Sequence, residues 1–205
     1  MWPAFNATSA PAGNLTHLSL NGDVSVLDVS GNLPLVDLNC EGNQIETLNV
    51  TSNVALTGLN CKDNNITALD VSNNTELKHL ICSNNDITPN LDVSANTKLV
   101  ELDVSETLIN GLDLDSNTNI EKLACGYNNL IDDLDVQPLT SLKVLDCAEL
   151  SISSLVLNAC TELTDLSCDN NTELGTLDVT DNLKLVHCSC PRVNLDSIDL
   201  SNNIE

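Results

Sequence analysis

The chain has 205 residues, of which 30 are acidic and seven basic, so its formal net charge is −23 at pH 7. Hydrophobic residues make up 41% of it, which excludes a disordered chain, and no apolar run reaches the ~20 residues that a membrane helix needs. A field this negative repels phosphate and anionic lipid, so we expect no nucleic-acid partner and no membrane insertion.

Residues 1–14 precede any repeating pattern and begin "MWPAFNATSAPAG". They lack the basic start and long apolar centre of an intact signal peptide. Either the protein stays in the cell, or a signal has been removed or lies outside this chain. Trp2, Pro3, Phe5 and Pro11 would fold over the first repeat, or the segment is a disordered leader; we assign 1–14 as a leader or partial cap.

From residue 15 to residue 205 one pattern occurs nine times, with steps of 20 to 22 residues. The template is L-x-x-L-x-C-x-x-N-x-I-x-x-L-D-V-S-x-N-T-x. Its copies begin at Leu15, Leu35, Leu56, Leu77, Leu99, Ile120, Leu142, Leu163 and Leu185. We therefore treat 15–205 as one repeat domain.

The template resembles the leucine-rich repeat family, since its first eleven positions match L-x-x-L-x-L/C-x-x-N-x-L. The short period and the "LDVSxNT" tail are most similar to bacterial cell-surface repeats of the BspA-like type found in Bacteroidota. The resemblance implies a right-handed solenoid that is exported or attached to the cell surface. It also implies a non-enzymatic role in protein interaction or adhesion.

The alternation within one repeat predicts the same fold class without the family. Leu59-Asn60-Cys61 sends Leu59 and Cys61 to one side and Asn60 to the other, as in a strand with one buried face. A second alternation, 69–71, faces the opposite side of the coil. Too few residues remain for a helix. We predict a β-rich solenoid of about nine coils, with a parallel sheet on one face and extended or 3₁₀ segments on the other.

Two sets of residues are predicted to be structural. An amide both donates and accepts hydrogen bonds, so it can satisfy backbone groups at the corners of the coils; the asparagines assigned to this role are Asn43, Asn64, Asn85, Asn128 and Asn171. Thiols at the inward template position are predicted to be free, buried and unreactive: Cys40, Cys61, Cys82, Cys125, Cys147, Cys168 and Cys190. The stretch "HCSC" (187–190) is the densest metal candidate, but its histidine points away from its thiols, so we predict no metal.

The outward positions of the main strands vary while the core positions repeat, so this face is free to specialise. Its candidate partner-binding residues are Asp37, Asn39, Asn60, His79, Ile81, Glu101, Asp103, Lys122, Asp146 and Asp165. A merely solvated sheet face is the alternative. No nucleophile–histidine arrangement, G-x-S-x-G motif or phosphate-binding glycine loop is present, so we predict that the chain is not an enzyme.

The opposite strand carries a regular acidic column whose members include Asp28, Asp70, Asp92, Asp113 and Asp135. Two interpretations remain open: a solubilising face, or weak multivalent Ca²⁺ binding by hard oxygen ligands. A salt-rich habitat would also explain the acidity of the chain. No other cofactor is predicted.

These observations favour a non-enzymatic interaction or adhesion module of an exported or cell-surface protein. Its partner would be a protein or another macromolecule, and a basic one suits the charge. The alternative is a structural solenoid that associates end to end through uncapped coils. An intracellular location is the less favoured one.

Overall fold

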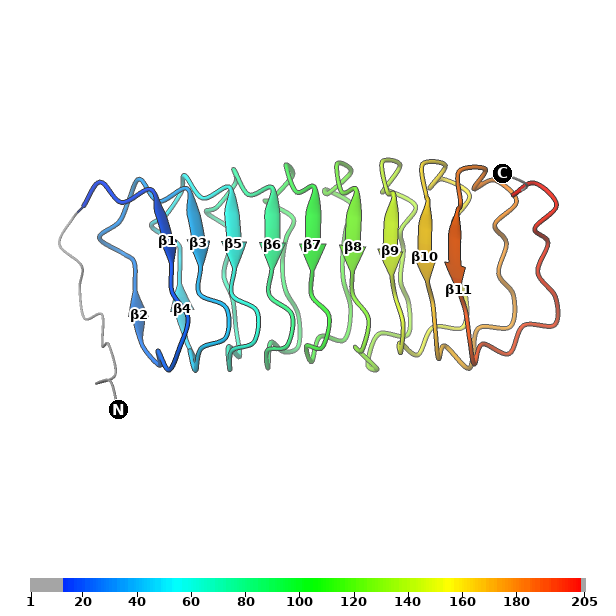
Figure 1. Ribbon diagram of the computed structural model, residues 1–205, viewed down its shortest axis with the longest axis horizontal. Helices are drawn as coiled ribbons and strands as arrows, with labels where there is room; N and C mark the ends of the chain where they lie inside the picture. Colours follow the sequence, from blue (N-terminus) through cyan, green and yellow to red (C-terminus); the bar gives the residue numbers. More distant parts are fainter. Residues whose placement is uncertain (1–12, 204–205) are drawn as a thin grey trace.

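A computed structural model of the chain describes residues 13–203. The chain winds into a solenoid whose turns lie side by side along one axis, with the first and last described turns at opposite ends (Figure 1). The predicted leader, 1–14, lies almost wholly outside the described residues, as do Trp2 and Phe5.

Nine strands form the main sheet, and all are parallel. They are β1 (His17–Ser19), β3 (Asp37–Asn39), β5 (Gly58–Asn60), β6 (His79–Ile81), β7 (Glu101–Asp103), β8 (Lys122–Ala124), β9 (Val144–Asp146), β10 (Asp165–Ser167) and β11 (His187–Ser189). Each strand pairs with the next in exact template register, for example Leu38 with Leu59 and Leu59 with Leu80. The predicted parallel-strand solenoid is confirmed, although the nine strands bound eight complete turns and the prediction was about nine coils.

The opposite side of the coils is mostly turns and irregular extended chain. In the described part of the chain, one pair of strands forms there, β2 (Leu27–Asp28) and β4 (Leu48–Asn49), as a two-stranded parallel sheet. Residues 13–203 contain neither α- nor 3₁₀-helix. Of the two predictions for this side, extended or 3₁₀ segments, the extended one is therefore correct. None of the described segments could cross a membrane as a helix.

The core lies between the main sheet and these extended segments. The central leucine of each strand from β3 to β10 is at most 2% exposed, and the inward valines of the opposite side, such as Val50 and Val71, are fully buried. Full burial of one such side chain contributes about 1.5–3 kcal/mol before entropy is counted. Each coil covers one side of the next, so stacking buries an apolar face that a single coil would expose.

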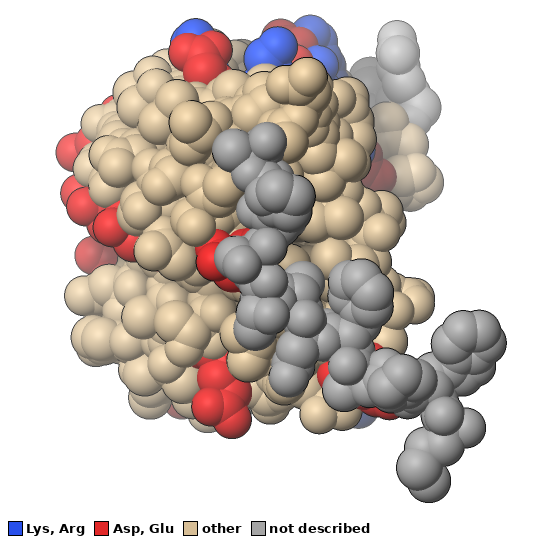
Figure 2. Space-filling view, turned by 90° about the vertical axis from the view of Figure 1, so that its left-hand side faces the viewer, with Lys and Arg blue, Asp and Glu red and all other residues tan. Residues whose placement is uncertain are grey.

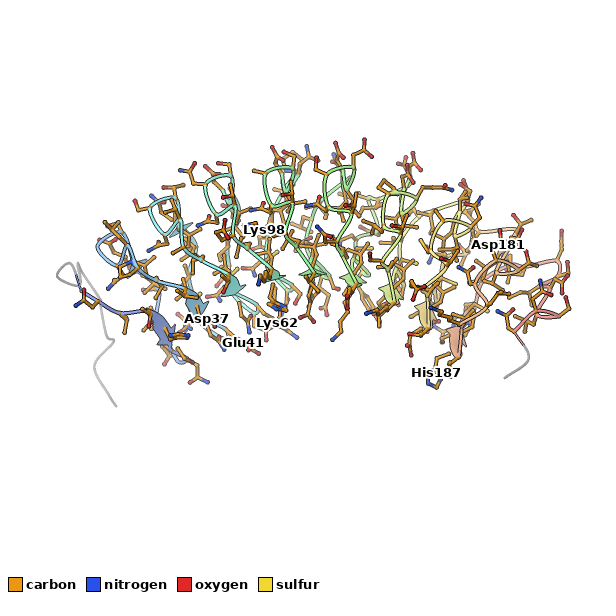
Figure 3. The ribbon with its side chains drawn as sticks, turned by 90° about the horizontal axis from the view of Figure 1, so that it is seen from above. Asp37, Glu41, Lys62, Lys98, Asp181 and His187 are labelled. Carbon is orange, nitrogen blue, oxygen red and sulfur yellow. The ribbon has the colours of Figure 1, made fainter. Side chains whose placement is uncertain are left out.

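The solenoid is gently curved, and the main sheet lies on its concave side (Figure 3). Asp37, Glu41 and Lys62 lie on this side near one end, and His187 lies on it near the other. Seen from the β1 end, most of the visible surface of the described residues is uncharged, with acidic side chains at the margin and near the middle and basic ones at the top (Figure 2). The curvature places the outward residues of the main sheet inside the arc.

Candidate functional site

The candidate site is the concave strand face, which we define as the outward side chains of the nine main-sheet strands. Two outward positions flank the inward residue of each strand, and register pairing aligns each position into a column. The first column is His17, Asp37, Gly58, His79, Glu101, Lys122, Val144, Asp165 and His187. The second is Ser19, Asn39, Asn60, Ile81, Asp103, Ala124, Asp146, Ser167 and Ser189.

The structure places all ten predicted partner-binding residues on this face, five in each column. Asp37, His79 and Lys122 are exposed and the other seven are half-buried. They extend from β3 to β10 and do not converge on one pocket. A shallow groove of about 620 Å³ crosses β9–β11 between Asp146 and His187. The arrangement suits a ligand that contacts many coils.

Every histidine of the chain lies in the first column beside a carboxylate of the neighbouring strand. His79 Nδ1 lies 3.1 Å from Glu101 Oε2, and Lys122 Nζ lies 3.9 Å from Glu101 Oε1. The two other pairs, His17 with Asp37 and His187 with Asp165, have N–O distances of 4.0 Å. The sequence analysis identified the column but missed this pairing. The one-repeat offset between partners is the signal that would have found it.

The polar residues of the second column also terminate their strands. Asn39, Asn60, Asp103 and Asp146 each accept a hydrogen bond at Oδ1 from the backbone N–H two residues later, at 3.0–3.2 Å. Such a local bond satisfies a donor where ladder pairing stops. One oxygen of each side chain therefore stabilises the turn after its strand. The second polar atom is also bonded in two of them: Asn60 Nδ2 donates to Glu41 Oε2 at 3.0 Å, and Asp103 Oδ2 accepts from Ser83 Oγ at 2.8 Å.

A third feature, which the sequence analysis missed, is a rim along the edge of the concave strand face. The residue two positions after each inward cysteine or valine, from the second coil to the last, has a left-handed backbone, with φ between 51° and 68°. Its members are Gly42, Asp63, Asn84, Glu106, Tyr127, Glu149, Asn170 and Arg192. We call them the αL rim. Their backbones bond from coil to coil, so their side chains form another column.

The acidic column on the opposite side has a local structural role. Asp70 Oδ1 accepts hydrogen bonds from Ser72 N at 3.0 Å and from Ser72 Oγ at 2.6 Å. Asp28, Asp92 and Asp178 repeat this pattern. These bonds lower the pKa of each carboxyl. One oxygen of each carboxylate is thus engaged, and the other is free to meet solvent cations.

The predicted asparagines occupy a corner where the strands of the main sheet end. Asn64 Nδ2 donates to the carbonyl oxygens of Cys40, Cys61 and Lys62 at 2.9–3.1 Å, while its Oδ1 accepts from Ile45 N at 3.0 Å. Each amide therefore ties its own coil to the preceding one. Thr107 fills this position in the fifth coil and Leu150 in the seventh, and Thr107 Oγ1 donates to Val104 O at 2.9 Å.

A second corner column stands at the other turn of the coil. Asn53 Nδ2 donates to Val29 O and Asn32 O, and the pattern recurs in later coils. Cys160 takes this position in the seventh coil and directs its thiol at Val136 O, 3.4 Å away. Like the first corner, this one joins neighbouring coils, so we assign it a structural role.

All nine cysteines are free, and seven are buried. Burial raises the pKa of the Cys40 thiol to about 12 and that of Cys168 to about 12. The prediction of a uniformly buried thiol column was wrong at its end. Cys190 is half-buried and Cys188 is exposed, because no following coil covers them within the described residues.

Across residues 13–203, no three or more His, Cys, Asp or Glu side chains come together as metal ligands. In "HCSC", His187 faces the concave side beside Asp165, and its two cysteines point the other way. What the arrangement can do is present charge, hydrogen bonds and small apolar patches over a long surface.

Comparison with solved structures identifies the fold as that of leucine-rich repeat proteins. The functional domain of InlJ from Listeria monocytogenes, which includes a cysteine ladder, is 33% identical to this chain, with a TM-score of 0.89. The match covers 94% of this chain and 43% of that one, so the chain spans less than half of the InlJ fragment. No protein-family model and no curated protein matches the sequence.

Two more distant structures share the fold alone. The leucine-rich repeat ectodomain of the plant membrane receptor kinase GASSHO1/SCHENGEN3 from Arabidopsis thaliana is 18% identical, with a TM-score of 0.76 over 89% of this chain and 24% of its own. It was solved in complex with CASPARIAN STRIP INTEGRITY FACTOR 2. TLR13, solved in complex with ssRNA13, is 20% identical, with a TM-score of 0.62 over 87% of this chain and 33% of its own.

Proposed function

We propose that the protein is a non-enzymatic module that binds a partner protein across the concave strand face. One observation carries the proposal: the inward positions are nearly uniform, whereas the outward positions of the same strands vary from coil to coil. A surface that served only solubility would not need His79, Ile81 and Lys122 in a chain with so few basic residues. Two of the structurally similar proteins were solved with bound ligands, a partner factor for GASSHO1 and an RNA for TLR13.

A protein partner fits this chain better than a nucleic acid does. The net charge is −23, and on the concave strand face only Lys122 is a lysine or arginine. A phosphate backbone would meet repulsion along most of the arc, whereas a basic protein would be attracted to it.

The location and the adhesive role belong to the same proposal. We infer an exported or cell-surface protein because the repeat resembles bacterial cell-surface repeats of the BspA-like type. The InlJ fragment, from Listeria monocytogenes, supports a bacterial origin without favouring the Bacteroidota subgroup. Epitope tagging in the source organism, followed by protease treatment of intact cells, tests the location; a tag that stays protected contradicts it.

Cross-linking tests the binding face. A photoreactive residue at position 81, on the concave strand face, is compared with one at position 73, an exposed asparagine on the opposite side. We expect position 81 to give a discrete cross-linked protein that unlabelled chain competes away, and position 73 to give none. Equal products from both positions, or products from position 73 alone, would overturn the proposal.

A second candidate is end-to-end association, which the last coil favours. Among residues 13–203, strand β11 pairs with β10 alone, Cys188 is exposed although it takes an inward leucine position, and Leu200 is 47% exposed. An open strand edge beside apolar side chains can pair with another copy. Light scattering over a range of concentrations tests this, and a Leu200→Lys variant should remain monomeric if the last coil is the contact. A monomer at every concentration excludes it.

A further inference from the structure

The αL rim has an unusual composition in three consecutive coils. Glycine, asparagine and aspartate tolerate positive φ, and they occupy the rim at Gly42, Asp63, Asn84 and Asn170. In the fifth to seventh coils the rim instead carries Glu106, Tyr127 and Glu149, with φ of 52°, 61° and 53°. Gly42 shows that the fold needs no side chain here.

Tyr127 stands out in this group. It is the only Phe, Trp or Tyr among residues 13–203, and 52% of it is exposed. Its hydroxyl has no hydrogen-bond partner within the described part of the chain. An exposed ring contributes little to core packing, and tyrosine is enriched among the residues that dominate binding energy at interfaces.

Glutamates lie on both sides of this ring. Glu106 N donates to Gly126 O at 3.0 Å, and Tyr127 N donates to Ala148 O at 2.7 Å, next to Glu149. These bonds fix the three coils in register, so neighbouring rim side chains start about 4.8 Å apart. Both glutamates are exposed. Tyr127 thus has an exposed glutamate before it and another after it along the αL rim.

Small residues lie next to Tyr127 in its own coil and in the following one. Gly126 and Ala148 are buried, and Ala124 is half-buried. Gly126 admits no larger residue, because an added Cβ would lie 2.9 Å from Ala148 O. Asp103 and Asp146 lie in the second column on either side of Ala124. Four acidic residues therefore occupy the rim and second-column positions of these coils: Glu106, Glu149, Asp103 and Asp146.

The rim already holds one guanidinium, that of the chain itself. Arg192 Nη1 donates to Asn170 Oδ1 at 3.1 Å, and Asn170 Nδ2 donates to Glu149 Oε1 at 3.2 Å. A cationic side chain thus lies along this same column and is linked through an amide to Glu149. On its other side along the αL rim Glu149 is preceded by Tyr127 and Glu106, and neither of these is basic.

We propose that Tyr127, Glu106 and Glu149 receive an arginine or lysine side chain of the partner protein. The ring would hold the cation over its face, and the two carboxylates would accept its hydrogen bonds. This assignment rests on the proposed function, and it commits to a basic segment of a protein as the occupant. A neutral ligand would leave the four carboxylates unused.

The test uses the full chain and a peptide carrying four arginines separated by glycines, with a citrulline peptide of the same shape but no charge. Tyr127 is the only tyrosine, so a ¹³C-tyrosine label gives one set of ring signals. We expect saturable shifts with the arginine peptide and none with the citrulline peptide. Ring signals that respond equally to both, or to neither, overturn the proposal.

Variants separate this site from the general negative field. Fluorescence anisotropy of the labelled arginine peptide should show about fivefold weaker binding for Tyr127→Leu and for Glu106→Gln/Glu149→Gln, and less than twofold change for Tyr127→Phe. The matched control is Glu46→Gln/Glu173→Gln, which removes the same charge from exposed positions outside the concave strand face and the αL rim. Equal weakening by the control pair would show a diffuse field and overturn the site.

The outcome is distinguishable from failure of the proposed function. If position 81 cross-links a partner but the arginine peptide ignores the rim variants, only this inference falls. If the peptide binds as expected while position 81 cross-links nothing, the rim site stands and the wider concave strand face loses its role.

Discussion

The side-chain amide of Asn64 donates a hydrogen bond of 3.0 Å to the carbonyl oxygen of Cys61, three residues earlier in the same coil. The same nitrogen reaches Cys40 O in the preceding coil at 2.9 Å. One side chain therefore closes its own turn and fastens it to its neighbour. In a solenoid without helices, such contacts between coils take the place that helix packing has in other folds.

We predict that Asn64→Ala lowers the free energy of unfolding by about 2–4 kcal/mol, because it leaves buried groups such as Ile45 N and Cys40 O without partners. Asn64→Thr should cost less, since Thr107 fills this corner in the fifth coil with its hydroxyl bonded to Val104 O. Urea unfolding measures both. Asn65→Ala, at an exposed neighbouring position, is the control and should change stability by less than about 0.5 kcal/mol.

The buried thiols predict a loss of stability at alkaline pH. Burial raises the pKa of Cys40 to about 12, while the same thiol in the unfolded chain ionises near 9.0. The neutral form is favoured in the fold, so stability is intact below pH 9 and falls as pH rises toward 12, by up to about 1.4 kcal/mol per pH unit for each thiol.

The variant Cys40→Val isolates this effect, because Val104 shows that valine fits the same column. Its urea midpoint should fall less steeply with pH than that of the wild type. Parallel pH curves for the two proteins would contradict the prediction. In the native protein below pH 9, only Cys188 and Cys190 should react with a thiol reagent.

The fold could be predicted from the sequence because the same alternation of apolar and polar residues recurs in every repeat. Leu59 and Cys61 face inward and Asn60 outward, and one coil suffices to predict the rest. The coil-to-coil register follows from the nearly constant period. The exposure of Cys188 could not be predicted from the repeat pattern, because an inward side chain is buried only where a coil packs on each side of its own.

The αL rim was missed because the residue type at a position predicts a positive φ only weakly. Gly42, Asp63 and Asn84 suggest positive φ, but Glu106 and Tyr127 at the same position hide it. The role of Asp70 was likewise obscured. Its hydrogen bonds to Ser72 are local, so they follow from the Asp-x-Ser spacing and need no ligand.

Acid should weaken the turns that the opposite acidic column stabilises. Hydrogen bonds from Ser72 lower the pKa of Asp70 below its ordinary value of 3.8. The contribution is present above the unfolded pKa and is lost as pH falls through the folded pKa. Asp70→Asn keeps the acceptor, as Asn49 does for Thr51, and removes the titration. The difference in urea midpoint between wild type and Asp70→Asn should therefore change below pH 4 and stay constant above pH 5; a constant difference throughout contradicts this.

The calcium hypothesis remains a prediction. The free carboxylate oxygens of Asp28, Asp70, Asp92, Asp113 and Asp135 are hard ligands, and binding to them would be weak and additive. We expect millimolar Ca²⁺ to raise the melting temperature beyond the effect of NaCl at the same ionic strength. Asp70→Asn/Asp92→Asn should reduce that increment. Equal melting in both salts excludes the hypothesis.

Tyr127→Asn should stabilise the fold and weaken the binding of the arginine peptide. A bulky residue at φ of 61° carries backbone strain of about 1–3 kcal/mol, and asparagine, which Asn84 and Asn170 show at the same rim position, relieves much of it. For a chain of this length, 1 kcal/mol corresponds to a rise of about 2–4 °C in melting temperature. The reverse change, Asn84→Tyr, should lower the melting temperature by a similar amount. A lower melting temperature for Tyr127→Asn would mean that the ring makes contacts the fold needs, and the case for a ligand-directed tyrosine would then weaken.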